Sequence, residues 1–273
     1  MFTVSTPMFQ PTKIDETKAI ILNFSTSNVS NLSKMLSTSL GFNCIWQAED
    51  GLSHILHNPT LSKDLLLFLT QSDSHKEPLS EEHLLVFYLN DEEKFHTLCG
   101  KLYFCGAEKV AAFNPYWDLY GTTFLLPDQF RIVLCKNAYS RYNARIAMPS
   151  HSLNKAQFYF ETELKFKKIA AFENHAGFDG IILSTGKIDC HLELTYYHSN
   201  QDAQEITMPV SEDRFSVGLI KIGEVKKPCE NYHDGQGHYV KIWADREEPW
   251  IAAFLKQEVI ADLRSQNRPT IDP

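Results

Sequence analysis

The period of the hydrophobic positions changes in an order that recurs along the chain. A compact apolar run comes first, a segment with apolar residues three and four positions apart follows, and three short runs typical of strands come last. In the first copy the apolar run is KAIILNF (18–24), and Val29 and Leu32 begin the helical spacing. Its strand candidates are residues 42–47, 52–58 and 64–70. The first copy therefore predicts a module of one strand, one amphipathic helix and three further strands.

The same order of elements recurs twice more. In the second copy, EHLLVFYLND (82–91) precedes a helix that we expect to end at Gly106, because glycine readily adopts the left-handed conformation that follows many helices. In the third copy, ARIAMPS (144–150) precedes the helix SLNKAQFYFETEL. The remaining strand candidates are residues 108–114, 121–126 and 130–136 in the second copy and residues 166–173, 178–184 and 190–197 in the third. Repetition of one unit supports this interpretation more strongly than any single strand does.

The C-terminal part fits the repeat only in part. Residues 213–223 and 237–244 alternate like strands, and residues 247–266 form an amphipathic helix with Pro249 in its first turn, where proline is tolerated. Only the segment NRPTIDP follows this helix, so three further strands do not fit. We expect a divergent fourth module.

A single module leaves one sheet face uncovered, and two modules side by side form a curved sheet around a cleft. We therefore expect an α+β protein of repeated βαβββ modules that form curved mixed sheets, with the second half partly degenerate. The expected parts are an N-terminal extension (1–17), a two-module domain (18–137) and a second domain (142–273). The second domain consists of a complete module (142–200) and the divergent part.

Composition and charge narrow the classes of partner and compartment. A net charge of −8 argues against nucleic acid, whose binding depends on clustered Lys and Arg. Six cysteines without a C-x-x-C pair indicate reduced thiols and a cytoplasmic location. The first 17 residues lack the features of a signal peptide, and no apolar run approaches the ~18 residues of a membrane span. We expect a cytoplasmic protein that binds neither nucleic acid nor a membrane.

Two stretches carry a recognisable pattern: HLLVFYLNDEEKF followed by NPYWDLYGTTFLLPDQFRIVL, and HAGFDGIILSTGKIDCHLELTYYH. They resemble the vicinal oxygen chelate superfamily, the glyoxalase and bleomycin-resistance group, and most closely its YycE-like branch. The resemblance is clear over residues 82–198, and residues 18–72 fit by pattern only. In the family the HLELT module precedes the NPYWD module, whereas here the order is reversed. Either each half of the chain is a two-module domain, which we prefer because copy one lies beside copy two, or copies two and three pair in permuted order.

The resemblance implies metal-ligand positions in the first and last strands of each module. Glu193 takes the last-strand position in HLELT, whereas Phe68 and Val133 take it in the first and second copies. Arg145 lies near the first-strand position of the third copy, and its own positive charge opposes a cation. His83 in the second copy is one residue out of register, which turns its side chain to the other face.

His191 and Glu193 should point to the same face of their strand, because they are two residues apart. Two ligands fall short of the three that catalytic zinc or iron sites usually have. Candidates for a third are His175, His198, His233 and His238, although we interpret YHDGQGHYVKIW, which also contains Asp234, as a hairpin turn. We expect a degenerate metal site and no cofactor. The alternative is a divalent metal, Zn, Fe, Mn or Ni, held by His191 and Glu193.

The segment NPYWDLYG (114–121) carries the densest group of aromatic residues. In one interpretation Tyr116, Trp117 and Tyr120 form the wall of a pocket for a planar ligand. Asp118 then orients a polar group of that ligand. In the other interpretation the segment is a packed loop that fixes the edge of the sheet.

Three functions remain open at the level of sequence. The first is binding of a small ligand or a partner in an aromatic-lined cleft with a degenerate metal site. The second is a metal-dependent lyase or dioxygenase of glyoxalase type, for which Glu193 and His175 are the catalytic candidates. The third is a protein-interaction scaffold that uses the C-terminal helix through Trp250, Phe254 and Ile260. A homodimer or another protein partner is compatible with each.

Overall fold

The computed structural model describes residues 16–72, 79–136, 142–198, 214–222, 230–233 and 239–244. Several sequence predictions concern residues outside these ranges: most of the N-terminal extension, Asp234 and His238 of the predicted hairpin, and the C-terminal helix with Trp250, Phe254 and Ile260. No helix among the described residues has the length and apolar character needed to cross a membrane.

The first module has the predicted order of elements. Its helix begins after Asn28, whose side chain accepts the backbone N–H of Asn31 at 2.8 Å, and ends at Gly41, which has φ of 75°. The elements are β1 (Glu16–Thr26), α1 (Val29–Leu40), β2 (Asn43–Gln47), β3 (Ser53–His57) and β4 (Leu65–Gln71).

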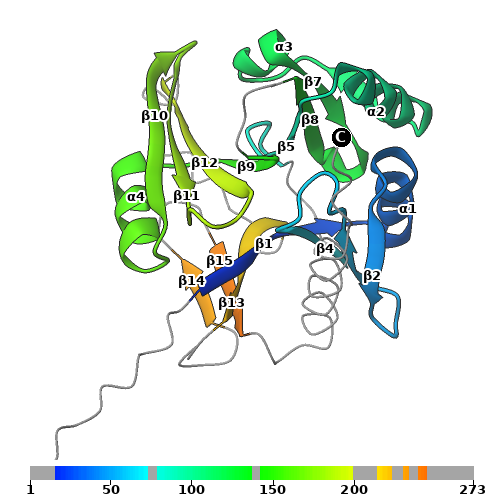
Figure 1. Cartoon of the computed structure of the whole chain (residues 1–273), viewed down its shortest axis with the longest axis horizontal. Helices are drawn as coiled ribbons and strands as arrows, with labels where there is room; N and C mark the ends of the chain where they lie inside the picture. The colour runs from blue at the N-terminus through cyan, green and yellow to red at the C-terminus, as the bar shows by residue number, and fades with distance from the viewer. Residues whose placement is uncertain are drawn as a thin grey trace, which may run out of the picture.

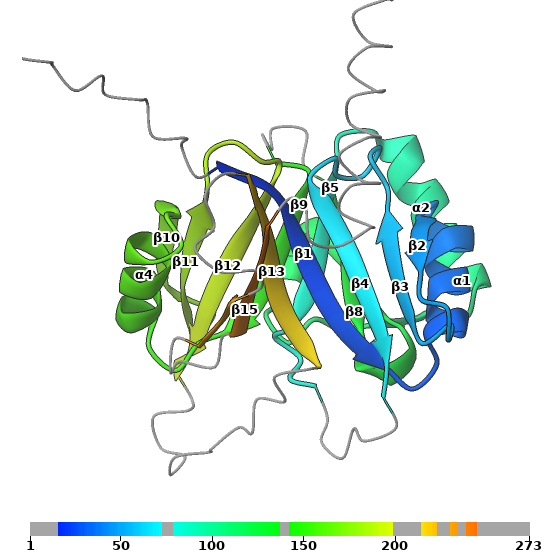
Figure 2. The same cartoon turned by 90° about the horizontal axis from the view of Figure 1, so that it is seen from below.

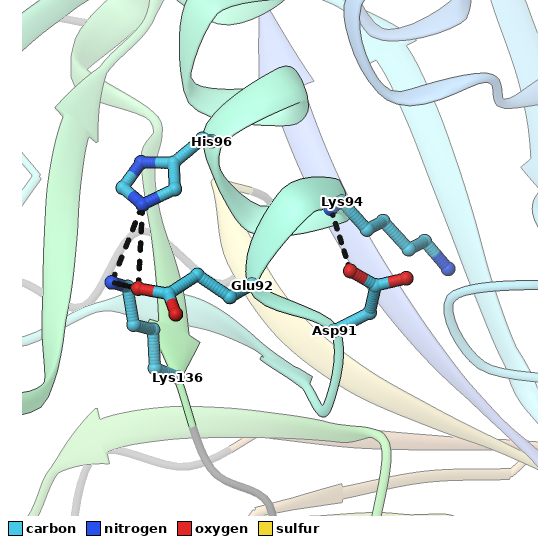
Figure 3. Close-up of polar contacts among 5 residues, drawn as sticks. All are labelled: Asp91, Glu92, Lys94, His96 and Lys136. Carbon is cyan, nitrogen blue, oxygen red and sulfur yellow. Dashed lines mark hydrogen bonds and ion pairs between the residues drawn. The ribbon is translucent and has the colours of Figure 1, made fainter.

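The second module also has this order, with an added short helix. Asp91 caps the main helix by accepting the backbone N–H of Lys94 at 3.0 Å, and Lys136 at the end of the last strand reaches Glu92 at 2.6 Å (Figure 3). The elements are β5 (Leu84–Leu89), α2 (Glu92–Phe104), β6 (Glu108–Val110), α3 (Tyr116–Tyr120), β7 (Gly121–Leu125), the 3₁₀ turn η1 (Pro127–Gln129) and β8 (Arg131–Lys136).

The third module is complete, and three further described strands follow it. The third comprises β9 (Ala144–Pro149), α4 (Leu153–Thr162), β10 (Lys167–His175), β11 (Phe178–Ser184) and β12 (Cys190–Tyr197). The later strands are β13 (Phe215–Ile222), β14 (Glu230–His233) and β15 (Tyr239–Ala244). The predicted α+β class is confirmed.

The modules pair in two mixed sheets, and the predicted pairing is wrong. One sheet has the order β10-β11-β12-β9-β5-β8-β7-β6 and the other the order β14-β15-β13-β1-β4-β3-β2. Copies two and three therefore share a sheet through antiparallel β5 and β9, and copy one pairs instead with the C-terminal strands through antiparallel β1 and β13. The first strands of all three copies are buried on both faces, so their composition suits the centre of either sheet and does not select a partner.

A shared hydrophobic core lies between the two sheets and their helices. Phe24 of β1 contacts Phe130 beside β8 at a ring distance of 4.5 Å, which joins residues of both sheets. Figure 1 shows α1 and α2 side by side at one end of the molecule and α4 at the other, and Figure 2 shows β1 and β4 in front of β9 and β12. Each sheet also has a face directed away from this core, and each of these faces carries its own apolar cluster.

Candidate functional site

The outward face of the sheet formed by copies two and three carries a buried charged group. β9 and β12 are parallel neighbours, with Arg145 opposite His191 and Ala147 opposite Glu193. Alternation along a strand places Arg145, His191 and Glu193 on one face. Nε of Arg145 donates to Nε2 of His191 at 2.7 Å, and Nη1 donates to Oε2 of Glu193. We call these three residues the arginine triad.

Burial shifts the pKa of two members of the triad, Arg145 and His191. The side chains of Arg145 and Glu193 are only 12% and 3% exposed. Burial lowers the pKa of Arg145, but the Glu193 carboxylate together with Tyr88 and Tyr116 outweighs this effect, and the net shift is upward. Burial, with the charge of Arg145 added, lowers the pKa of His191 to about 2. The triad is therefore a cation, an anion and a neutral imidazole, whose Nε2 accepts from Arg145 and whose Nδ1 carries the proton.

The guanidinium of Arg145 lies over the faces of two aromatic rings. Its central carbon lies 5.3 Å from the ring centre of Tyr88 and 5.5 Å from that of Trp117. Aromatic faces attract cations at such distances, so the rings replace part of the hydration that Arg145 loses. Trp117 is 1% exposed and serves this support instead of lining a pocket.

A pocket of about 210 Å³ opens beside the triad. Three of the site residues proposed from the sequence meet there, beside Arg145: Tyr116, His175 and Glu193. The rings of Tyr116 and His175 lie 5.4 Å apart, edge to face. The full lining is Asn114, Tyr116, Arg145, Phe172, His175, Ile182 and Glu193.

The Phe172 wall of the pocket depends on a glycine in the neighbouring strand. A Cβ atom at Gly180 would lie 2.2 Å from the ring of Phe172, so only glycine lets this ring cover β11. Sequence analysis missed Phe172, Ile182 and Asn114 as pocket residues. The motif GFDG did contain Gly180. Its pairing with Phe172 of the neighbouring strand β10 could not be predicted from the spacing of residues.

Other predicted site residues have different places. Asp118 accepts the backbone N–H of Ala112 at 3.1 Å and so holds the loop before α3. Tyr120 is 53% exposed, outside the pocket lining. Among the candidate third ligands, His198 pairs with Asp179 at 2.9 Å, away from the triad.

His83 behaves as its register predicted. Its ring packs edge to face against Phe215, with ring centres 4.8 Å apart. Phe215 belongs to the core between the sheets, so His83 points away from the outward face that carries the triad.

The side chains at this position do not fit a divalent metal. Among the described residues no group of three or more His, Cys, Asp and Glu side chains has the arrangement of a metal site. His191 Nε2 and Glu193 Oε2 both accept from Arg145, whose charge repels a cation. A metal would have to displace a buried ion pair, so we derive no chemistry through one.

A further carboxyl lies on the same sheet face and was not identified from the sequence. Glu82 precedes β5 by two residues and accepts Thr195 Oγ1 at 3.1 Å. Burial raises its pKa to about 7, and the Thr195 hydrogen bond opposes this only in part. Thr195 follows Glu193 by two residues on β12, so Glu82 belongs to the wider surroundings of the triad.

Comparison with known proteins identifies the part of the chain that carries this site. Residues 82–136 match the YycE-like C-terminal domain, and residues 144–195 match the YycE-like N-terminal domain. The central part of this chain is YycE-like. The two YycE-like domains occur in reverse order, and both lie in the sheet that holds the triad. The predicted resemblance to the YycE-like branch of the vicinal oxygen chelate superfamily is confirmed.

One curated relative and two solved structures extend the comparison. The uncharacterized protein YycE of Bacillus subtilis is 36% identical over 59 residues, which are 22% of this chain and 42% of YycE, so the match spans less than half of that relative. The crystal structure of glyoxalase I from Zea mays has a TM-score of 0.63 at 12% identity and covers 90% of this chain and 96% of its own. A crystal structure of B. subtilis YycE has a TM-score of 0.37 and covers 44% of this chain. At such identity the maize structure shows the fold alone, over nearly the whole chain.

Proposed function

We propose that this protein binds a small molecule in the pocket beside Arg145 and does so without a metal ion. The observation that carries the proposal is the arginine triad: a guanidinium, held by His191 and Glu193, lies at the position where the resemblance implies metal ligands. A fixed protein cation there supplies positive charge and directed N–H groups, which are the means of orienting a ligand.

The pocket has the composition of a small-molecule site. Tyr116, Phe172 and Ile182 give it flat or apolar walls, and Asn114 and His175 add polar groups beside the triad. Its volume of about 210 Å³ is below the ~300 Å³ at which pockets for drug-sized ligands begin. A cavity of about 150 Å³ is enough for benzene, so a single substituted ring matches the size.

Binding is better supported than acid–base catalysis at this site. The carboxylate of Glu193 is engaged by Arg145, which leaves His175 as the candidate base on the pocket wall.

We include in the proposal the reducing compartment inferred from the sequence. It is supported by five free cysteines among the described residues: Cys44, Cys99, Cys105, Cys135 and Cys190.

The test is ligand-observed NMR with a set of single-ring fragments of neutral, anionic and cationic character. We expect at least one fragment to bind, equally well with and without EDTA, and to lose binding in Ile182→Trp, where the indole fills the pocket. A matched control is Ile169→Trp, because Ile169 is an exposed β10 residue outside the pocket. The proposal is wrong if Ile182→Trp removes no binding, or if binding requires a metal that EDTA removes.

A further inference from the structure

Arg145 keeps hydrogen-bonding capacity that the protein does not use. A guanidinium has five N–H groups. One is donated from Nε to His191 and one from Nη1 to Glu193, and the described residues provide no acceptor for the others. Nη2 of Arg145, which has no hydrogen-bond partner among the described residues, is not fully buried. Because Arg145 lines the pocket, its remaining N–H groups are available there.

Glu193 has a matching unused acceptor. Its Oε2 binds Arg145, and no hydrogen bond joins its Oε1 to another described residue. Oε1, although it has no partner among the described residues, is not fully buried either, and Glu193 lines the same pocket. The pocket therefore offers an N–H donor from Arg145 beside a carboxylate acceptor from Glu193.

The net charge of the site restricts what can enter. Arg145 and Glu193 compensate each other, and His191 stays neutral because it accepts from Arg145. A charged ligand would bring an uncompensated charge into a largely buried site, which is strongly unfavourable. A neutral ligand loses only its own hydration, and it regains hydrogen bonds from the donor and the acceptor.

We propose that the pocket takes an uncharged planar molecule with a carbonyl oxygen and an N–H group side by side, as in a primary amide, a lactam or a cyclic urea. The carbonyl oxygen accepts from Arg145, and the N–H group donates to Oε1 of Glu193. The flat body of the molecule packs between Tyr116 and Phe172. This inference rests on the proposed function, because it names the ligand class of the same pocket.

Close analogues of such a ligand should be rejected for opposite reasons. A carboxylate of the same shape presents a second acceptor oxygen to Glu193, so two anionic oxygens meet. An amidinium presents a second donor to Arg145, so two cations meet. A site that pairs both polar groups discriminates strongly against a ligand that leaves one of them unpaired.

The test uses three probes of nearly equal shape: benzamide, benzoate and benzamidine. Their dissociation constants are measured by NMR titration of the full chain at pH 7.5 and low salt. We expect benzamide to bind at least about tenfold more tightly than either charged probe, which corresponds to about 1.4 kcal/mol. Ile182→Trp should remove all three, and Ile169→Trp should remove none.

A second variant tests the role of Glu193 directly. Glu193→Gln replaces the acceptor with a group that can also donate and leaves the charge of Arg145 uncompensated, so the preference should shift from benzamide to benzoate. Tightest binding of benzoate or benzamidine by the wild-type pocket overturns this inference and leaves the proposed function standing. Absence of pocket binding by all three probes contradicts both. If Glu193→Gln does not fold, the order of the wild-type affinities decides.

Discussion

The two sheets share one parallel pairing of strands but differ in the side chains at a few equivalent positions on their outward faces. In the sheet of β1 and β4, the parallel pair places Ile21 opposite Leu66, and these residues pack in an apolar cluster. In the sheet of β9 and β12, the same parallel pairing places Arg145 opposite His191. The register makes three pairs of equivalent positions: Ile21 and Arg145, Leu66 and His191, and Phe68 and Glu193.

The comparison separates what the backbone determines from what the side chains determine. One strand arrangement holds an apolar set in one sheet and a charged set in the other. The apolar set is stable residue by residue, because each burial removes apolar surface from water. The charged set is stable only as a whole, because each buried charge depends on its partner. A site can therefore be gained or lost on this fold by exchanging a few side chains.

The largest effect should come from breaking the triad at one member. Glu193→Leu leaves the buried guanidinium of Arg145 without its counter-ion and should lower the free energy of unfolding by about 3–5 kcal/mol. The matched control transfers the whole set of the other sheet: Arg145→Ile, His191→Leu and Glu193→Phe together. We expect this triple variant to be more stable than Glu193→Leu in urea denaturation. A triple variant less stable than the single one would show that the two faces are not interchangeable.

The next effect concerns an equivalent pair of aspartates that joins the sheets. Asp64 and Asp189 each precede the last strand of their module by one residue. The Asp189 carboxylate accepts from Ser62 Oγ at 2.5 Å, the backbone N–H of Lys63 at 3.0 Å and Asn143 Nδ2 at 2.9 Å. Asp189→Ala leaves these donors unpaired and should cost about 2–3 kcal/mol in urea denaturation.

A milder replacement at the same position is the control. Asp189→Asn keeps one acceptor oxygen and should retain more of the stability than Asp189→Ala does. Equal stability of the wild type and Asp189→Ala would mean that this connection contributes nothing to holding copy one against copy three.

A third prediction concerns pH and the first strands. Val86 pairs with Arg145 in one sheet, and Gly218 pairs with Ile21 in the other, so Val86 and Gly218 occupy equivalent positions. Glu82 and Arg214, each four residues earlier, are equivalent in the same way. Burial raises the pKa of Glu82 from 4.5 to about 7, so the folded protein holds a proton there more tightly than the unfolded chain does. Its contribution is complete below pH 4.5 and is lost as the pH rises to 7. The loss should be about 3 kcal/mol at most.

Glu82→Gln isolates this contribution from those of other acids. Between pH 4.5 and 7 the free energy of unfolding of the wild type should fall relative to that of Glu82→Gln, measured by urea denaturation at several pH values. Parallel pH profiles for the two proteins would show that Glu82 titrates normally. Asp64, whose pKa burial raises to about 6, is present in both proteins and cancels in the comparison.

Local patterns were enough to predict most elements of the fold but not their partners. The predicted strand 190–197 matches β12, and 121–126 differs from β7 by one residue, because alternation and turn residues are local signals. The pairing of modules depends on which buried first strand meets which, and β1, β5 and β9 are all central strands with long apolar stretches, so their composition does not select a partner. The prediction relied on proximity along the chain, whereas the segment between copies one and two leads from one sheet to the other.

The candidate site was predictable to the extent that it lies on one strand. His191 and Glu193 were placed on one face from their spacing, and the structure agrees. The positive charge of Arg145 was expected to oppose a metal ion. Its role as the partner of both residues, however, depends on the register of β9 against β12. Trp117 was expected in the pocket wall, yet the turn of α3 carries it inward to the guanidinium. Such contacts come from packing between elements, which spacing does not encode.

The smallest effect should come from the exposed ion pair at the start of α2, which is the surface counterpart of the buried pair. Glu92 contacts Lys136 at 2.6 Å and His96 at 3.5 Å, and the side chain of Glu92 is 72% exposed (Figure 3). Water and salt screen such pairs, so Glu92→Gln should change Tm by less than about 1 °C at 0.15 M salt. The control is Asp91→Ala, which removes the side-chain cap of α2. It should lower the free energy of unfolding by about 1 kcal/mol and therefore lower Tm by several degrees. A larger loss from Glu92→Gln than from Asp91→Ala would mean that exposure does not separate weak ion pairs from strong ones in this fold. The contrast between the buried triad and this surface pair would then need another physical cause.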